Sequence, residues 1–334
     1  MLRGISDNPV YELCLAHHKT AALRAAVEMD VFTRIGRAGA SAEALAAGTG
    51  SSPRGMRILC DFLCVIGLLE KNGGTYVLTP EAGRYLDRTS TQCLADVVGY
   101  YASEKMAMMV MRDPASYVMA GGNAGAGMES VGHPVWVQYA RAMAPFASIA
   151  AKRAAAYLAR KGMRPERVLD VAAGHGLFGL EAARISDTAA LVAIDGEGVL
   201  AVARENAEKA GMASRFRVIV GDAFEADWDG AYDLILIPNF LHHFHRDACV
   251  RLLAKSKGHL APGGAIFVID IMPNPDRVSP PEKAAFAFFM LATTKEGDAY
   301  TAEEIERMAR DAGLAVAGSM PLSPTPQTLL DLRH

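Results

Sequence analysis

The sequence predicts an α/β protein that contains a doubly wound, mostly parallel sheet and a smaller helical domain before it. Two observations lead to this fold class. From residue 166 onwards, short apolar runs alternate with helix-forming segments, as in parallel strands joined by helices. Residues 1–100 show helical periodicity and one short hairpin. We therefore predict a helical domain over 1–100, linking helices over 101–165 and the α/β domain over 166–334.

Composition narrows the possible functions. Hydrophobic residues make up 51% of the 334 residues, the net charge is −3 and the pI is about 6.3. A sizeable core can form, and there is no general electrostatic footprint for nucleic acid. The sequence has no bilayer-spanning apolar stretch and no signal-peptide core. The five cysteines follow no metal or disulfide spacing. We expect a cytoplasmic protein with no nucleic-acid or membrane partner.

A winged helix is predicted within residues 1–100. Apolar residues recur at helical spacing over Ala16–Ile35. A second helix is expected to begin after Ser41, a suitable N-cap, and Ser52 with the proline that follows it should open a third. Leu68–Thr79 then has the pattern of strand, Asn-Gly turn and strand.

A winged helix also suggests DNA binding. The third predicted helix carries only Arg54 and Arg57 near its start, and the hairpin carries only Lys71. These basic residues are too few for a surface that must contact several phosphates. A packing or dimerisation module is therefore the favoured interpretation, and a winged-helix regulator that senses a metabolite is the hypothesis from a different class.

The linking segment is rich in methionine and helical in pattern. Its last helix is expected over Val135–Arg160, kinked or broken near Pro145. Tyr139, Met143 and Phe146 lie on roughly one side of that helix. The methionines of the linking segment can form ordinary core or a pliable wall for a flat organic substrate, and the sequence leaves both interpretations open. They are Met106, Met108, Met109, Met111, Met119, Met128 and Met143.

A strand, a glycine-rich turn and a helix follow one another from Arg167. Gly174 and Gly176 allow a sharp turn and a close approach to a ligand. Together with Gly179 they match a dinucleotide fingerprint, which alone is a weak signal. Asp170 lies within the strand, where a carboxylate would repel a pyrophosphate and attract a sulfonium. A nicotinamide cofactor is accordingly the less favoured interpretation.

Acidic residues also end the next two strands. Leu191–Asp195 ends in an acid about 20 residues after the glycines, where a carboxylate can bind ribose hydroxyls. A third strand from Phe216 is expected to end at Asp222, with Phe224 available to cover an adenine ring. The remaining strands are expected at Tyr232–Pro238, Ala265–Ile271, Ala315–Leu322 and Thr328–Arg333, with a turn at Leu260–Gly264. Ligands of such sheets bind at the carboxyl ends of the strands.

Nearly the whole chain resembles the bacterial and plant small-molecule O-methyltransferases that carry an N-terminal winged-helix dimerisation domain. The matching segments are Asp170–Gly176, Gly221–Phe224, Asn239–Phe244, Leu260–Gly264 and Tyr139–Phe146. The resemblance implies a Rossmann-like class I methyltransferase domain, a homodimer and S-adenosylmethionine (SAM) as cofactor. It implies O-methylation of a hydroxyl on a small aromatic or polyketide-like metabolite. Ala172 stands where many members carry glycine.

The resemblance also assigns site residues. His242 takes the place of the catalytic histidine, which acts as general base; a histidine titrating near 6.5 suits a phenol of pKa about 10. The implied cofactor-binding residues are Asp170, Gly174, Gly176, Asp195, Asp222, Ala223, Phe224, Asn239, Tyr139 and Met143. The implied substrate pocket comprises His243, Phe146, Phe286, Phe289, Met290 and Tyr300. No metal site is expected, because no paired ligand motif lies near the histidines.

Positions around the catalytic histidine also depart from the family pattern. His243 replaces a common aspartate, and Ala299 replaces the glutamate that orients the catalytic histidine, with Tyr300 in the adjacent arginine position. Orientation would then need Asp298, Glu296 or no acid at all. C- or N-methylation and non-methylating SAM chemistry on the same fold therefore stay open. Thr301 and the glutamate three residues later are also expected to form a capping box.

Overall fold

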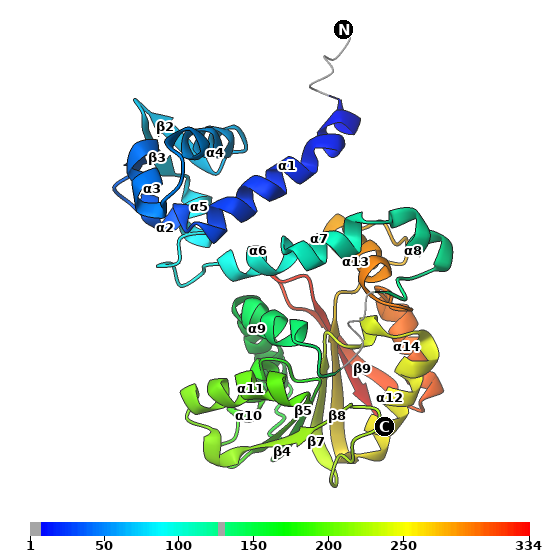
Figure 1. Cartoon of the computed structure of the whole chain (residues 1–334). Helices are drawn as coiled ribbons and strands as arrows, with labels where there is room; N and C mark the ends of the chain where they lie inside the picture. The colour runs from blue at the N-terminus through cyan, green and yellow to red at the C-terminus, as the bar shows by residue number, and fades with distance from the viewer. Residues whose placement is uncertain (1–7, 126–130) are drawn as a thin grey trace. The chain divides into compact units, whose positions relative to one another are not determined.

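The computed structural model describes residues 8–125 and 131–334. The chain forms two compact units, Met1–Met108 and Met109–His334 (Figure 1). Helix α7 (Glu104–Met111) crosses the boundary between them. None of the helices in the described part of the chain has the length and apolar character needed to cross a membrane.

The first unit is built from helices and a small sheet. Its helices are α1 (Pro9–Glu28), α2 (Val31–Ile35), α3 (Ala42–Thr49), α4 (Pro53–Val65), α5 (Pro80–Tyr85) and α6 (Ala95–Tyr101). Ser41 and Ser52 cap α3 and α4 through their side chains, as predicted. The single helix predicted over 16–35 is wrong, because Asp30 adopts a left-handed conformation with φ of 56° and separates α1 from α2.

The predicted hairpin is present in the first unit. Strands β2 (Leu69–Asn72) and β3 (Thr75–Leu78) pair antiparallel, and the short β1 (Ala40–Ser41) extends the sheet in the order β1-β3-β2. Lys71 and Arg57 both bind the carboxylate of Asp61, at 2.6 and 2.9 Å. Two of the three basic groups considered for DNA contacts are therefore already neutralised within the unit.

The second unit is organised around a seven-stranded sheet. Its strands are β4 (Arg167–Val171), β5 (Ala190–Asp195), β6 (Phe216–Val220), β7 (Tyr232–Pro238), β8 (Leu260–Asp270), β9 (Ala315–Pro321) and β10 (Thr328–Arg333). They lie in the order β6-β5-β4-β7-β8-β10-β9. The first five in sequence run parallel, and β10 is antiparallel to both β8 and β9. The strand order reverses between β4 and β7, where such sheets form a ligand-binding crevice.

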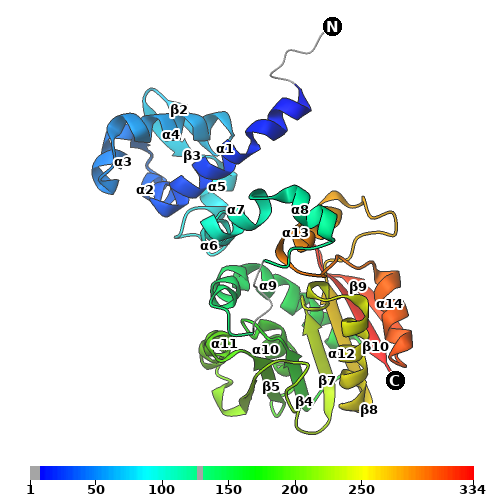
Figure 2. The same ribbon diagram turned by 45° about the vertical axis from the view of Figure 1, so that its right-hand side comes forward.

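Helices cover both faces of this sheet (Figures 1 and 2). On one face lie α9 (Val135–Arg160), α10 (Leu177–Ala183) and α11 (Glu197–Lys209), and on the other lie α12 (Arg246–Gly258) and α14 (Ala302–Asp311). The unit also contains α8 (Pro114–Ala120), α13 (Pro281–Thr293) and the 3₁₀ turns Ala213–Arg215 and Leu241–His243. The predicted doubly wound α/β fold is confirmed.

Three local predictions need correction. Helix α9 runs through Pro145 without ending. The turn predicted at Leu260–Gly264 belongs to β8, because Leu260 pairs with Tyr232 across a register shift, with Gly263 at φ of +78°. Strand β6 ends at Val220, so Asp222 lies in the loop beyond it.

Candidate active site

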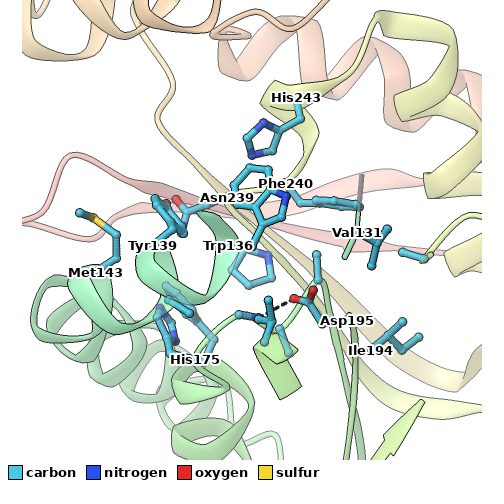
Figure 3. A pocket seen from close by; sticks show the side chains of 18 of the residues that line it. Val131, Trp136, Tyr139, Met143, His175, Ile194, Asp195, Asn239, Phe240 and His243 are labelled. Carbon is cyan, nitrogen blue, oxygen red and sulfur yellow. Dashed lines mark hydrogen bonds between the residues drawn. The ribbon is translucent and has the colours of Figure 1, made fainter. Parts of the chain in front are cut away.

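A cavity opens at the carboxyl edge of the sheet, at the point where the strand order reverses (Figure 3). Segments that follow β4, β5, β6 and β7 line it together with α9, the end of α13 and the residue before β10. It encloses about 1270 Å³ including its mouth.

The glycine turn after β4 forms one wall of the cavity. Gly174 and Gly176 have φ of +58° and +72°, which glycine adopts without steric cost. A Cβ on Gly179 would lie 2.6 Å from Leu191 Cδ1 and 2.8 Å from Asp170 Oδ2. The third glycine therefore permits close packing of α10 against the sheet. Ala172 has φ of 51°, which explains why glycine would suit this position.

Asp170 lies fully buried behind the turn and outside the cavity lining. Its Oδ2 accepts a hydrogen bond from Gly179 N at 2.9 Å, and its Oδ1 has no partner. Burial, with a smaller contribution from the charge of Asp195, raises the pKa of Asp170 to about 8 despite the Gly179 hydrogen bond. This carboxyl group is therefore mostly protonated at neutral pH, and it acts on the site by fixing the turn through Gly179.

Asp195 ends β5 and lines the cavity. Asp195 is labelled in Figure 3; its Oδ2 accepts a hydrogen bond from Gly174 N at 2.9 Å. Its Oδ1 accepts one from Gly196 N at 2.7 Å. These bonds fix the carboxylate and leave lone pairs for ribose hydroxyls. Burial raises the pKa of Asp195 to about 6, against the effect of the two backbone donors.

Asp222 and Ala223 line the cavity beyond β6. Asp222 Oδ1 accepts a hydrogen bond from Phe224 N at 2.8 Å. The Phe224 side chain lies outside the lining and packs edge-on against Phe244 at a centroid distance of 4.9 Å. Phe244 and Phe240 line the cavity themselves, so the loop after β7 supplies aromatic rings at the place where the sequence suggested Phe224.

The other side of the cavity is aromatic and comes mainly from α9. Tyr139, Met143 and Phe146 line it, as does Trp136, which sequence reasoning missed (Figure 3). Asn239 also lines the cavity, directly after β7 with φ of 51°. Of the methionines for which core and ligand wall were both left open, Met143 lines the cavity, Met106 is buried core, and Met128 lies outside the described residues.

The paired histidines after β7 have different surroundings. His242 is buried, 4% exposed, and lies outside the cavity lining. Its Nδ1 lies 2.6 Å from Asp270 Oδ1, and its backbone N–H donates to Asp270 Oδ2 at 3.3 Å. Because a carboxylate can only accept, Nδ1 carries the proton and Nε2 has the free lone pair. The Phe286 ring stands perpendicular to the imidazole, at a centroid distance of 4.9 Å.

The acid beside His242 corrects one expectation from the sequence. Asp298 pairs with Arg277 at 3.1 Å, and Glu296 lies 3.7 Å from His245. Ala299 is fully buried. Asp270 instead reaches His242, because β7 and β8 are adjacent parallel strands whose carboxyl ends meet. The sequence signal was the acid at the end of the apolar run Ala265–Ile271.

His243 lines the cavity and forms part of its aromatic wall (Figure 3). Its ring stands nearly perpendicular to Trp136 at a centroid distance of 5.3 Å, and it lies 4.3 Å from His242. Burial, together with His242, lowers the pKa of His243 well below its usual value. Burial also lowers the pKa of His175, on the glycine-turn side, to about 4. Both imidazoles are therefore neutral at pH 7.

The remaining predicted pocket residues lie outside the cavity lining. Phe286 stacks on Phe289, Met290 is buried, and Tyr300 donates a hydrogen bond to Phe244 O at 2.7 Å. The lining residues that sequence reasoning did not assign are Val131, Trp136, Ala140, Ala147, Ala172, Ala173, His175, Phe178, Ile194, Val199, Gly221, Pro238, Phe240, Phe244, Thr293, Thr294 and Gln327. Most of these residues belong to no local sequence motif, because they come from segments that are far apart in the chain and meet only in the folded protein.

A doubly wound sheet with a glycine turn after its first strand and an acid at the end of the second has the architecture of a class I methyltransferase. Family comparison agrees: an O-methyltransferase domain matches residues 105–315, and an O-methyltransferase dimerisation domain matches residues 11–88. The chain belongs to the O-methyltransferase family and is an enzyme of the methyltransferase class.

Two relatives that are similar over most of the chain are named as O-methyltransferases. A 3-hydroxy-5-methyl-1-naphthoate 3-O-methyltransferase from Streptomyces sahachiroi is 27% identical over 88% of this chain and 86% of its own length. The acetylserotonin O-methyltransferase of Mus musculus is 27% identical over 90% of this chain and 82% of its own.

Solved structures show the same fold. A candidate O-methyltransferase from Nostoc punctiforme PCC 73102 superposes with a TM-score of 0.90 at 40% identity, covering 97% of this chain and 98% of that one. Human N-acetylserotonin methyltransferase in complex with SAM superposes with a TM-score of 0.83 at 21% identity, covering 99% of each chain.

Proposed function

We propose that the enzyme transfers a methyl group from SAM to a hydroxyl of a small aromatic or polyketide-like molecule, with His242 as general base. The observation that carries this proposal is the His242–Asp270 pair, which lies beside a cavity bounded on its other side by the glycine turn and Asp195. Asp270 can orient His242 in place of the glutamate that Ala299 replaces. The pair therefore favours O-methylation over C- or N-methylation and non-methylating chemistry.

SAM would occupy the side of the cavity formed by the glycine turn. Asp195 would accept hydrogen bonds from the ribose hydroxyls, and Asp222 with Ala223 would border the adenine. Asp195, whose pKa is raised only to about 6, places negative charge near the sulfonium at neutral pH, which favours a cationic ligand. The aromatic side formed by α9 would then hold the acceptor.

The reaction needs alignment and removal of one proton. The acceptor oxygen forms a bond to the methyl carbon while the carbon–sulfur bond breaks, and S-adenosylhomocysteine (SAH) leaves. The hydroxyl proton goes to Nε2 of His242, while Asp270 holds Nδ1–H and stabilises the imidazolium that forms. The His242 ring lies 4.3 Å from that of His243, which lines the cavity, and 4.9 Å from that of Phe286. Alignment with the sulfonium contributes on the order of 7–11 kcal/mol at best.

We also propose that the protein acts as a homodimer in the cytoplasm. The match to a dimerisation domain over 11–88 supports the assembly. Val10 and Leu13 of α1 are 65% and 74% exposed in the single chain, which agrees with a partner for this helix. All five cysteines are unpaired thiols, the state expected in a reducing compartment. Residues 1–100 would form the winged-helix dimerisation domain, 101–165 would contribute helices to the acceptor pocket, and 166–334 would form the SAM-binding domain.

Calorimetric titration with SAH tests the cofactor half of this proposal. We expect micromolar binding of SAH and none of NADH. Labelled SAM with a panel of naphthols then tests transfer, and the label should appear on oxygen. Absence of SAH binding would contradict the proposal, as would a label on carbon or nitrogen.

A further inference from the structure

The acidic and imidazole side chains that line the cavity give it a defined charge. Among the described lining residues these are Asp195, Asp222, His175 and His243. At neutral pH the two aspartates contribute negative charge, and the two imidazoles are neutral because burial disfavours the imidazolium. The protein wall around both ligands is therefore acidic.

Bound SAM does not reverse this sign. Its sulfonium and ammonium groups outweigh its one carboxylate by a single positive charge, whereas Asp195 and Asp222 together contribute two negative charges. The sulfonium is also expected beside the glycine turn, where Asp195 is fixed by Gly174 and Gly196. The aromatic wall of Trp136 and His243 adds no compensating charge.

Two lysines of this unit are engaged by other groups of the protein. Lys255 donates to the backbone oxygens of Ala223, Phe224 and Ala226 at 3.0, 2.8 and 2.7 Å. Lys283 donates to Thr328 Oγ1 at 3.1 Å. Neither lysine belongs to the lining that the structure describes. An acceptor in the cavity therefore meets carboxylates, neutral imidazoles and apolar rings.

We propose that the acceptor is an uncharged hydroxy-aromatic molecule and not a phenolic acid, and that His243 is the residue that sets this preference. The inference rests on the proposed function and narrows its substrate class. His243 holds its imidazole against Trp136, on the wall where an aromatic acceptor would stack. A carboxylate on that acceptor would lose its hydration shell without gaining a cationic partner, beside two protein carboxylates.

Two probes that differ only in charge test the preference. 6-Hydroxy-2-naphthamide and 6-hydroxy-2-naphthoate share ring and reacting hydroxyl, and the second carries a carboxylate remote from it. Titrating each into the full-length protein saturated with SAH should give an affinity for the amide at least about tenfold higher, because like charges in a desolvated site cost several kcal/mol. Equal affinities, or tighter binding of the naphthoate, would overturn the proposal.

A charge series at His243 tests the residue itself. His243→Lys should shift the preference towards the naphthoate, His243→Asp should weaken naphthoate binding further, and His243→Asn is the neutral control that should preserve the preference for the amide. In turnover, the changes should appear in KM more than in kcat. A preference that does not move with the charge at 243 would overturn the role of His243.

A second position keeps the test independent of the folding of these variants. Gln327 lines the cavity from the segment before β10, and Gln327→Lys should also favour the naphthoate, whereas Gln327→Met should not. SAH binding distinguishes failure of the proposed substrate class from failure of the proposed function. If SAH binds but the naphthoate is preferred, only the proposed substrate class is wrong. If SAH does not bind, the proposed function fails with it.

Discussion

The two sides of the cavity are built in different ways. The cofactor side comes from the ends of β4, β5 and β6, within residues 172–223, and its polar groups are largely backbone atoms and two acids fixed by backbone N–H groups. The acceptor side gathers side chains from α9, from the loop after β7, from the end of α13 and from Gln327. The cofactor side comes from one continuous stretch of sequence, whereas the acceptor side combines residues from distant segments. Because the two sides share few residues, substitutions should affect cofactor binding and methyl transfer separately.

Among the substitutions that test this difference between the two sides, Asp270→Asn should cause the largest loss of turnover. The amide can no longer hold Nδ1–H of His242 as a charged acceptor, so turnover should fall by about 100-fold, as for other residues that orient a catalytic group. Neither KM nor SAH affinity should change by more than about twofold, since Asp270 lies outside the lining. Steady-state kinetics and calorimetry check this. Equal losses in SAH affinity and turnover would show that the two sides are not separable.

Asp195→Asn should affect the opposite side. The charge and one acceptor for the ribose hydroxyls are lost, and a hydrogen bond to a charged group contributes about 1.5–3 kcal/mol, so SAM affinity should fall by roughly 10- to 100-fold. Turnover at saturating SAM should stay close to that of the unmodified enzyme. A variant that binds SAM normally but transfers slowly would place Asp195 in the chemistry and contradict the division.

The buried acids should make cofactor-free stability depend on pH. The pKa of Asp170 is raised to about 8 and that of Asp195 to about 6, against about 3.9 in an unfolded chain. The folded state therefore binds more protons between about pH 4 and 8, and stability falls as pH rises through that window, by at most about 1.4 kcal/mol per unit and group.

Asp170→Asn isolates the larger of these two contributions. Thermal unfolding of the cofactor-free protein should show a smaller loss between pH 6 and 8 in the variant than in the unmodified chain. Over the same range SAM should bind more tightly as pH rises, because its positive charge favours the ionised carboxylates, and the neutral sulfur of SAH should respond less. An identical pH dependence in both proteins would contradict the assignment to Asp170.

Ala172→Gly should produce the smallest effect. Ala172 holds φ of 51°, a conformation that costs about 1–2 kcal/mol for a residue with a Cβ. Glycine relieves that strain but adds entropy to the unfolded chain. The net gain in stability should be about 0.5–1 kcal/mol, measured by denaturant unfolding, with unchanged SAH affinity. A destabilised variant would mean that the methyl group of Ala172 contributes packing that outweighs the strain.

The sequence could predict the features that form within a short stretch of chain, and it could predict only in part those that distant segments form together. The doubly wound sheet, the glycine turn and Asp195 follow from patterns within a few tens of residues, and each is present in the structure. Thr301 and its capping box are likewise local, and both hydrogen bonds form. Both the turn and Asp195 follow parallel strands, so the sequence placed them at the carboxyl edge of the sheet.

The acceptor side could be predicted only in part. Tyr139 and His243 were placed at a ligand site by resemblance and line the cavity. Asp270 was missed because its approach to His242 depends on the pairing of β7 with β8. Gln327 was missed because it reaches the cavity only through the antiparallel β10 at the far end of the chain. Periodicity describes which face of an element is buried, and it does not describe which distant elements meet there.

The most direct test of the central claim is single-turnover methyl transfer by the unmodified enzyme and His242→Ala with two acceptors, a naphthol and a nitronaphthol that is already ionised at the assay pH. If His242 removes the proton, the variant should be slower by about 100-fold or more with the naphthol. With the ionised acceptor it should be slower by less than about tenfold. An equal loss with both acceptors, or no loss with the naphthol, would contradict the role of His242 as general base.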